Sequence, residues 1–279
     1  MTESEIKLIA TDLDGTLVHN KKMSPRDRRT LERLLSKGIP VVPATTRMRF
    51  SSSEILKNTN IFDHPVVCMN GARVVGPRWD QHDDHEDWMV THLDESTAGA
   101  VSSFADENSY ELTTVFSERK YWRKRRDQSV GPHLKEPITY LVNNNIDALE
   151  DGPPISFMMH KERNGSEGLR DMEIYVKENH GKKTITHRHN YLGEWVALTI
   201  YPYQISKLKA LELVCENMDI GLENVLAIGN DYVDLDMIKG CGIGVAMENS
   251  PDEVKEAADF VSSSCLDNGF SCAVEHYGL

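Results

Sequence analysis

The stretch that decides the fold is Ile6-Lys7-Leu8-Ile9-Ala10-Thr11-Asp12-Leu13-Asp14-Gly15-Thr16-Leu17. Its first half is mostly apolar, which predicts a buried strand over residues 6–11. Asp12 and Asp14 follow this strand directly, and Gly15 allows the sharp turn that comes next. Because ligands of open α/β sheets bind beyond the carboxyl ends of the strands, both carboxylates are expected where chemistry takes place.

Two acids separated by one residue can divide a reaction between them, because one can attack as a nucleophile while the other transfers protons. Two other interpretations are a solvent-exposed turn and a calcium-binding loop of the EF-hand kind. The calcium loop requires a glutamate at its twelfth position, which is Met23 here. The pattern therefore favours a catalytic pair over a calcium loop.

A strand-then-helix order continues from this point to about residue 75, and it is typical of a parallel sheet flanked by helices. Ser24 and Pro25 form a helix start, and Gly38 stands where a terminating glycine is expected. This places the first helix between the first and second strands.

The second strand is predicted over residues 39–44, and we expect it to be short or irregular because Pro40 and Pro43 remove ladder donors. A third apolar run over residues 66–69 ends at Asn70-Gly71, a turn signal.

From about residue 76 to 194 the chain becomes richer in charge and histidine, and strand-like runs over residues 111–116, 155–160 and 196–200 alternate with helical ones. The strand-and-helix order returns after Ser206, with a strand over residues 225–229. Ser250-Pro251-Asp252-Glu253 predicts a capping box that opens another helix.

The predicted architecture is an α/β fold: a doubly wound (Rossmann-like) parallel-sheet core that carries an inserted α+β domain. The core is discontinuous and comprises residues 1–80 and 196–279, and the insertion comprises residues 81–195. The length of 279 residues suits two domains of modest size.

Composition excludes several classes of protein. The net charge of −13 argues against a general nucleic-acid binder, which needs a basic surface. No apolar run approaches the length of a membrane span, and no signal-peptide pattern precedes the first strand, so we expect a cytoplasmic protein with no membrane partner. The five cysteines are scattered without a C-x-x-C pair, which indicates neither a disulfide framework nor a zinc site.

Residues 12–17 resemble the first motif of the haloacid dehalogenase-like phosphohydrolases, and the chain is similar to their Cof-type branch with a type IIB cap. The resemblance runs through both ends of the chain in order. The other matching positions are Thr45-Thr46-Arg47, Asn70-Gly71, Ser206-Lys207, residues 229–234 and residues 267–270.

The resemblance implies a role for each matched residue. Asp12 would be the nucleophile that forms an aspartyl phosphate, and Asp14 would be the acid and base. Thr45 and Lys207 would hold the phosphoryl oxygens as catalytic residues. Substrate-binding positions would be Thr46, Arg47, Asn70 and Gly71, although Arg47 fits a structural ion pair with a core carboxylate equally well.

The resemblance also implies a magnesium ion, held by Asp12, Asp14 and Asn230 with Asp231 and Asp234 in support. The sequence departs from the family pattern here, because Asn230 replaces the usual aspartate and Val233 replaces the usual asparagine. An amide oxygen can coordinate magnesium but brings no charge, and a hard cation prefers carboxylates. Thr46 and Leu208 replace glycines that are usual in two of the other motifs.

Two further stretches have an unusual amino-acid composition. Residues 80–87 are rich in aspartate and histidine, and a solvated hinge is favoured over a second metal site. Residues 119–126 are basic and aromatic, and an exposed cap helix is favoured over a site for an anionic leaving group or a nucleic-acid strand.

The sequence predicts a magnesium-dependent phosphomonoester hydrolase for sugar phosphates or similar small phosphorylated metabolites, acting as a monomer or a homodimer. The inserted domain would be the cap that selects the leaving group. Two alternatives remain open. A phosphosugar mutase would use the same nucleophile, and a catalytically weak binding or regulatory protein would explain Asn230 and Val233.

Overall fold

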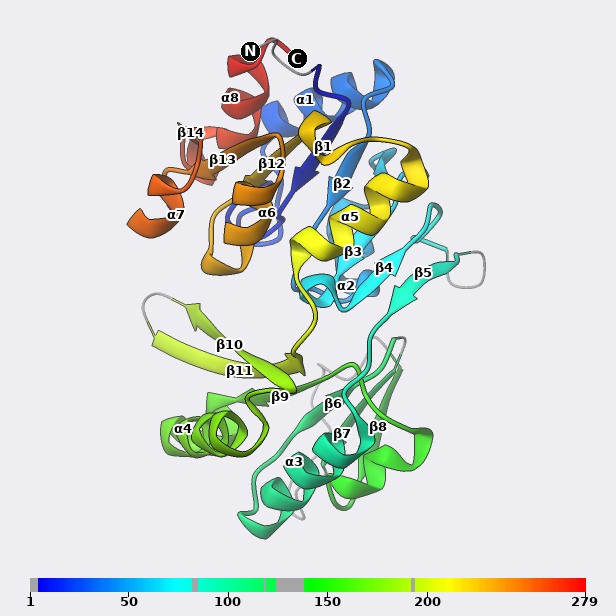
Figure 1. The fold of residues 1–279 in the computed structure, drawn as a ribbon, viewed down its shortest axis with the longest axis vertical. Helices are drawn as coiled ribbons and strands as arrows, with labels where there is room; N and C mark the ends of the chain where they lie inside the picture. Colours follow the sequence, from blue (N-terminus) through cyan, green and yellow to red (C-terminus); the bar gives the residue numbers. More distant parts are fainter. Residues whose placement is uncertain (1–4, 82–84, 118, 124–137, 192–193) are drawn as a thin grey trace. The chain divides into compact units, whose positions relative to one another are not determined.

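Strand β1 (Leu8–Thr11), the apolar run before Asp12, is fully buried between two parallel neighbours. It pairs with β12 (Val225–Gly229) on one side and with β2 (Val41–Pro43) on the other. The whole sheet has the order β14-β13-β12-β1-β2, with parallel pairing throughout (Figure 1). The computed structural model describes residues 5–81, 85–117, 119–123, 138–191 and 194–279.

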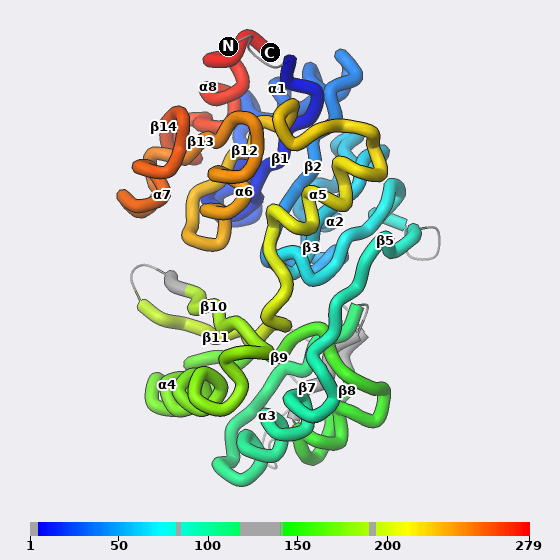
Figure 2. The backbone as a smooth tube through the Cα atoms, in the orientation of Figure 1, coloured from blue at the N-terminus to red at the C-terminus, as the bar shows by residue number. Residues whose placement is uncertain are grey.

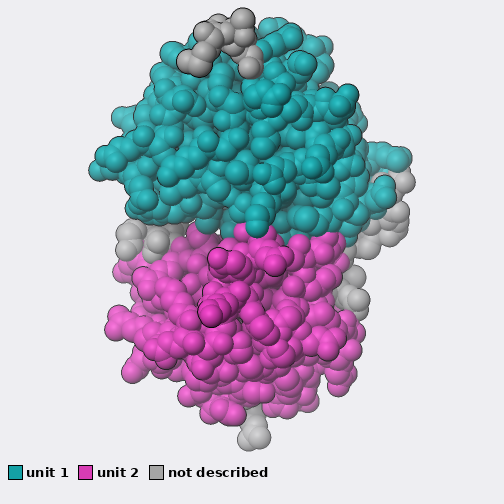
Figure 3. Space-filling view, in the orientation of Figure 1, with its two compact units in different colours: residues 1–89, 206–279 teal, residues 90–205 magenta. Residues whose placement is uncertain are grey.

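The chain divides into two compact units, one made from both ends of the sequence and one from its middle (Figure 3). Unit 1 comprises Met1–Met89 and Ser206–Leu279, and unit 2 comprises Val90–Ile205. The colours of Figure 2 show the same division, because blue, cyan, yellow and red segments all belong to unit 1.

The remaining elements of unit 1, in chain order, are α1 (Pro25–Ser36), α2 (Arg49–Leu56), β3 (Val66–Cys68), β4 (Arg73–Val75), β5 (Asp87–Val90), α5 (Lys207–Met218), α6 (Leu235–Gly240), β13 (Ile243–Met247), α7 (Asp252–Glu256), β14 (Phe260–Ser262) and α8 (Gly269–His276). Strand β5 ends one residue beyond the unit boundary.

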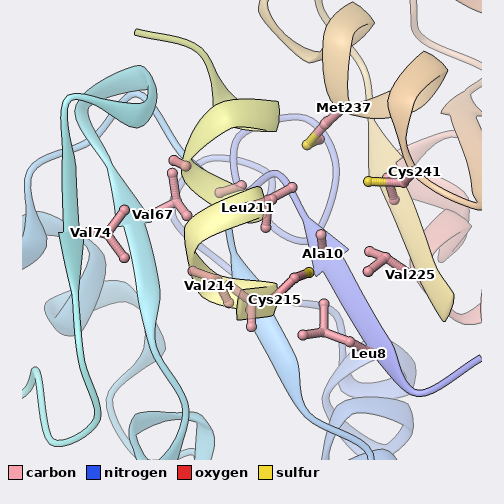
Figure 4. Close-up of a cluster of buried hydrophobic side chains, with 14 residues drawn as sticks. Leu8, Ala10, Val67, Val74, Leu211, Val214, Cys215, Val225, Met237 and Cys241 are labelled. Atoms are coloured by element: carbon pink, nitrogen blue, oxygen red, sulfur yellow. The ribbon is translucent and has the colours of Figure 1, made fainter. Parts of the chain in front are cut away.

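Helices cover both faces of the parallel sheet, which makes the core doubly wound (Figure 1). Alternate residues of a strand point to opposite faces. Leu8 and Ala10 of β1 therefore share a face, and they pack in one cluster with Leu211 of α5 and Met237 of α6 (Figure 4). Helix α1 contacts β2 and α8. The prediction of a doubly wound α/β core is confirmed.

Strand β2 is short, as its prolines predicted. It has three residues and stands at the end of the five-stranded sheet, where a missing ladder donor costs least. Beyond it, a single bridge between Ala44 and Val67 leads to a second small sheet of order β3-β4-β5.

Unit 2 is an α+β unit with its own core. Its strands are β6 (Thr113–Val115), β7 (Arg119–Arg123), β8 (Ile138–Val142), β9 (Ser156–His160), β10 (Thr184–Tyr191) and β11 (Glu194–Pro202), in the sheet order β10-β11-β9-β6-β7-β8. Its helices are α3 (Glu95–Glu107) and α4 (Lys161–His180). The pairing is antiparallel except between β7 and β8. Apolar residues of both helices pack on Phe157, Met159, Leu198 and Ile200.

The units divide after Met89 and after Ile205, whereas the sequence pattern placed the divisions after residues 80 and 195. Two strands explain the difference. Strand β5 belongs to the β3-β4-β5 sheet of unit 1, and β11 continues to Pro202 within the sheet of unit 2. A composition change marks a region of the chain, but strand pairing decides where a compact unit ends.

Two local predictions are wrong. The helix near residue 250 starts at Asp252 with Pro251 as N-cap and no side-chain cap bond, and the hydroxyl of Ser250 has no hydrogen-bond partner among the described residues. Residues 119–123 form strand β7 and not a helix. The rest of that basic stretch, residues 124–126, lies outside the described residues.

The end of the acidic stretch near residue 80 belongs to a strand of unit 1. Asp87 is the first residue of β5, and its carboxylate accepts a hydrogen bond of 2.7 Å from Nε of the buried Arg73. Residues 82–84 lie outside the described residues. Among the residues that the structure does describe, no helix combines the length and apolar character that a membrane crossing requires.

Asp27 joins the two ends of the chain within unit 1. It lies buried in the first turn of α1, and its Oδ1 accepts hydrogen bonds from the backbone nitrogen and the hydroxyl of Ser271 in α8, at 2.9 and 2.7 Å. Its Oδ2 accepts a bond of 2.9 Å from the hydroxyl of Ser24, the N-cap of the same helix. The discontinuous core therefore depends on a buried carboxylate that binds a residue 244 positions away in the chain.

Replacement of Asp27 by alanine is expected to lower the free energy of unfolding of unit 1 by about 2–3 kcal/mol, because it leaves buried donors of Ser271 without an acceptor. Urea unfolding followed by circular dichroism measures this. Asp252→Ala is the control, because that carboxylate is 94% exposed and its loss should cost less than about 0.5 kcal/mol. Equal midpoints for the two variants would contradict the prediction.

Candidate active site

A buried lysine lies at the centre of the carboxyl end of the parallel sheet. Lys207 is the first residue of α5, and its Nζ donates hydrogen bonds to Asp12 Oδ1 at 2.7 Å and to Asp234 Oδ1 at 2.6 Å. Asp12 follows β1, and Asp234 ends the short helix η6 (Tyr232–Asp234) that follows β12. Because β1 and β12 are parallel neighbours, their carboxyl ends meet, and this brings the two carboxylates to the same lysine.

The electrostatics of this triad follow from its burial. Lys207 and Asp234 have no exposed side-chain surface, and Asp12 has little. Burial raises the pKa of Asp12 to about 7, with Asp234 adding to the rise and Lys207 opposing it. Burial alone would lower the pKa of Lys207, but Asp12 and Asp234 together raise it above its usual value. The lysine is therefore a permanent cation beside the Asp12 carboxylate.

Asp234 also shapes the loop that follows β12. Its Oδ2 accepts hydrogen bonds from the backbone nitrogens of Asn230 at 2.8 Å and Asp231 at 3.0 Å. The carboxylate of Asp231 accepts a bond of 2.7 Å from the backbone nitrogen of Tyr232, so it caps η6. One buried side chain thus fixes both Lys207 and the loop that carries Asn230.

The loops after β2 and β3 position Thr45 and the start of α5. Asn70 is buried in the short helix η2 (Met69–Gly71), and its backbone nitrogen donates to the Thr45 carbonyl at 3.0 Å. Gly71 has a φ of +89°, and a Cβ there would lie 2.2 Å from the carbonyl oxygen of Ser206. These two positions, predicted as substrate-binding, therefore hold Thr45 and let the N-terminus of α5 come close.

Arg47 forms an ion pair with Asp14. Its Nη2 donates to Asp14 Oδ1 at 2.6 Å, and its Nε donates to Asp14 Oδ2, so both carboxylate oxygens are engaged. Its Nη1 donates to the hydroxyl of Ser51 at 2.9 Å, and its backbone nitrogen donates to Thr45 Oγ1 at 3.1 Å. The neighbouring Thr46 is half-buried.

Asn230 lies where its amide meets three oxygen atoms. The hydroxyl of Thr16 donates to Asn230 Oδ1 at 2.8 Å. With the oxygen and nitrogen of the amide exchanged, its NH2 group donates to Thr16 Oγ1 at 2.8 Å, to the Asp14 carbonyl at 2.9 Å and to Asp12 Oδ2 at 3.3 Å. Gly15 makes this approach possible, because a Cβ there would lie 2.7 Å from Asn230 Nδ2.

These oxygens fit a hard cation such as Mg²⁺, which prefers oxygen ligands. With its oxygen turned toward Asp12 and the Asp14 carbonyl, the Asn230 amide places one acceptor beside two others, and a cation among them would satisfy all three groups. The set contains a single carboxylate, and among the described residues no three His, Cys, Asp or Glu side chains gather as a metal site. The cation would therefore depend on an amide and a carbonyl for its other protein ligands.

Two contacts of this region were not singled out from the sequence. Thr16 binds Asn230, and its place in the first loop was the available signal. Asn249, in the loop after β13, donates from Nδ2 to the Gly15 carbonyl at 3.0 Å. Its position beyond the end of another parallel strand could have identified it.

The doubly wound core and this cluster of residues at its carboxyl edge define a hydrolase of the haloacid dehalogenase-like class. The model of the haloacid dehalogenase-like hydrolase family matches residues 9–274, and the chain belongs to this family. The resemblance inferred from the motifs is thereby confirmed.

Relatives with assigned activities are phosphatases, which supports the phosphatase class for this chain. The chain is 27% identical over 276 residues to the 5-amino-6-(5-phospho-D-ribitylamino)uracil phosphatase YcsE of Bacillus subtilis, covering 99% of this chain and 97% of the relative. A solved haloacid dehalogenase-like hydrolase from Bacteroides thetaiotaomicron superposes with a TM-score of 0.81 at 26% identity, covering 98% of this chain and 100% of the other.

The fold extends to more distant proteins. A solved subclass IIB sugar phosphatase of the same superfamily superposes with a TM-score of 0.78 at 20% identity, covering 98% of this chain and 99% of the other. This likeness concerns the whole chain, including the α+β unit.

Asp234→Asn is expected to destabilise unit 1 by about 3 kcal/mol, because it leaves the buried Lys207 with one counter-ion and disturbs the acceptor of two backbone donors. Thermal and urea unfolding measure the loss. Asp231→Asn is the matched control, because asparagine caps a helix as well as aspartate does and the change should be nearly neutral. The prediction is wrong if the two variants unfold at the same midpoint.

Proposed function

We propose that the protein is a magnesium-dependent phosphomonoester hydrolase that uses Asp12 as a covalent nucleophile. The observation that carries this proposal is the placement of Asp12 at the carboxyl end of β1, where its Oδ1 is bound by the buried Lys207. The other oxygen, Oδ2, is left on the side of Asn230 and the Asp14 carbonyl. The carboxylate is thus oriented by a fixed cation, and a second acid stands two residues away.

The reaction has two steps in this proposal. A carboxylate oxygen of Asp12 attacks phosphorus while the bond to the ester oxygen breaks, and Asp14 gives a proton to that leaving oxygen. Asp14 then takes a proton from water as the water oxygen attacks phosphorus, which frees inorganic phosphate and restores Asp12. Asp14 can exchange protons with both the leaving oxygen and water, because 45% of its side chain is exposed.

A phosphate dianion and a carboxylate nucleophile repel each other, so the site must supply positive charge and hydrogen-bond donors. Lys207 supplies a fixed charge beside Asp12, and Thr45 adds a hydroxyl at the end of β2. When bound to Asp12, the Asp14 carbonyl and Asn230, Mg²⁺ would add the charge needed to bring the dianion to the nucleophile. Asp234 supports this set through Lys207 and the loop of Asn230 and Asp231.

We propose sugar phosphates or similar small phosphorylated metabolites as the substrates. Support comes from the relatives, three of which are named as phosphatases of a phosphorylated ribitylaminouracil, and from the net charge of −13, which disfavours a nucleic-acid strand. The α+β unit has its own core and is inserted between the two halves of unit 1, which suits a cap that selects the leaving group.

Asp12→Asn is expected to reduce phosphate release by about 10³–10⁶-fold, because the amide is isosteric but cannot act as a nucleophile. The measurement is release of inorganic phosphate from a panel of sugar phosphates, nucleotides and para-nitrophenyl phosphate, with and without Mg²⁺. Asp252→Asn, which changes a carboxylate that is 94% exposed at the start of α7, should release phosphate at the wild-type rate.

Other outcomes of this panel would redirect the proposal. Transfer of the phosphoryl group between sugars with little free phosphate would indicate a mutase. Absence of release from every ester, with and without Mg²⁺, would overturn the hydrolase and support a binding or regulatory protein.

Asn230→Asp is expected to tighten Mg²⁺ binding about tenfold or more, or about 1.4 kcal/mol, because the site gains a charged oxygen ligand. The same charge lies near Asp12 and should lower the melting temperature of the metal-free protein. Isothermal titration and the Mg²⁺-induced shift in melting temperature measure both effects. Asn217→Asp, near the far end of α5, is the control. Equal affinity in the variant and the wild type would contradict this assignment of the metal site.

A further inference from the structure

The ion pair between Arg47 and Asp14 engages both oxygens of the proposed acid and base. Nη2 and Nε of the guanidinium each bind one carboxylate oxygen, in the parallel two-bond arrangement that arginine forms with carboxylates. A carboxylate held in this way has a donor on each oxygen, which occupies two of its roughly four acceptor sites. Asp14 is therefore held in place in the substrate-free enzyme, with both of its oxygens directed at the guanidinium.

The site also needs a positive charge that can move to a substrate, and Lys207 is not placed to supply it. Lys207 has no exposed side-chain surface and is shared by Asp12 and Asp234. Arg47, by contrast, has 20% of its side chain exposed. A guanidinium matches a phosphate as well as it matches a carboxylate, with two parallel hydrogen bonds to either.

We infer that Arg47 is a positioning residue that holds Asp14 in the free enzyme and releases it by exchanging the carboxylate for the phosphate dianion of the substrate. This inference rests on the proposed function, since it assigns Asp14 the proton transfers. Arrival of a phosphate dianion, whether part of an ester or inorganic phosphate, would thus free the acid.

The anchoring of Arg47 suits such an exchange. Its backbone nitrogen donates to Thr45 Oγ1 at 3.1 Å, and its backbone carbonyl accepts a bond of 2.9 Å from the backbone nitrogen of Met69. Its Nη1 donates to Ser51 at 2.9 Å. The residue is therefore held at its backbone and at one nitrogen of its head, while the two nitrogens that bind Asp14 can change partners.

The exposure of the pair keeps the free energy of the exchange small. Asp14 has 45% of its side chain exposed, so water can solvate its carboxylate once the guanidinium leaves. Partly exposed ion pairs contribute little net stability, because solvation of the separated groups offsets most of the Coulomb attraction. A dianion offers the guanidinium more charge than the monovalent carboxylate does, which favours the exchange.

The test is a double-mutant cycle on the binding of inorganic phosphate, with Arg47→Gln, Asp14→Asn and the double variant titrated calorimetrically in the presence of Mg²⁺. Asp14→Asn removes the competing carboxylate, so it should tighten phosphate binding about tenfold when Arg47 is present. In the Arg47→Gln background the same change should tighten binding by about twofold or less, because no pair has to open. Repulsion between Asp14 and phosphate contributes alike in both backgrounds, and the cycle cancels it.

Steady-state kinetics give a second measurement. A purely structural role of Arg47 would not produce the pattern expected here. Arg47→Gln should raise KM for para-nitrophenyl phosphate about tenfold or more while kcat changes by less than about threefold. Arg47→Lys should restore part of the KM, because it returns the charge without the two-bond geometry. Arg26→Gln, which removes an exposed arginine paired with Glu275, should leave both constants unchanged.

The exchange is overturned if Asp14→Asn changes phosphate affinity equally in both backgrounds. It is also overturned if Arg47→Gln keeps the wild-type melting temperature and binds phosphate with unchanged affinity. A fall in kcat without a rise in KM would overturn it as well. If the wild type releases phosphate from no ester, the proposed hydrolase fails, but the phosphate titrations still decide whether Arg47 and Asp14 exchange.

Discussion

The structure depends on a buried ion triad in which Lys207 lies between Asp12 and Asp234. A charge that is removed from water is costly unless it is paired and hydrogen-bonded, so none of the three side chains can be buried there without the others. Their partners stand far apart in the chain, since 195 residues separate Asp12 from Lys207. The site therefore forms only when the first strand, the start of α5 and the loop after β12 have all come together.

That requirement explains why the core is built from both ends of the chain. Strand β1 pairs with β12, and Asp27 binds Ser271 across 244 residues, so the two halves of unit 1 are joined by backbone and side-chain bonds. The segment between them has its own sheet and its own apolar core. An insertion with an independent core can vary without disturbing the triad, which suits a family whose members act on different substrates.

Two residues near the triad, Asn230 and Arg47, affect the balance of charge in the site. Asn230 brings an amide to a position surrounded by oxygens, where it can either donate from its NH2 group or offer its oxygen to a cation. The proposed metal site thus has one negative charge fewer than an aspartate would provide. Arg47 binds Asp14 across the same edge of the sheet, so the charges of the acid and of the guanidinium are balanced before substrate arrives.

The sequence by itself determined the carboxyl ends of β1, β2, β3 and β12 to within one residue, because local patterns specify those termini. Asp12, Thr45, Asn70 and Asp234 were thereby placed within a few residues of a strand end. The sequence also predicted α1 with its Ser24 cap and the weakness of β2 at its prolines. Only the tertiary structure decided the partner of Arg47, the structural placement of Asn70 and Gly71, the loss of the Ser250 cap and the true ends of the two units. The physical reason is that these features are pairings between segments distant in sequence, whose geometry no local pattern records.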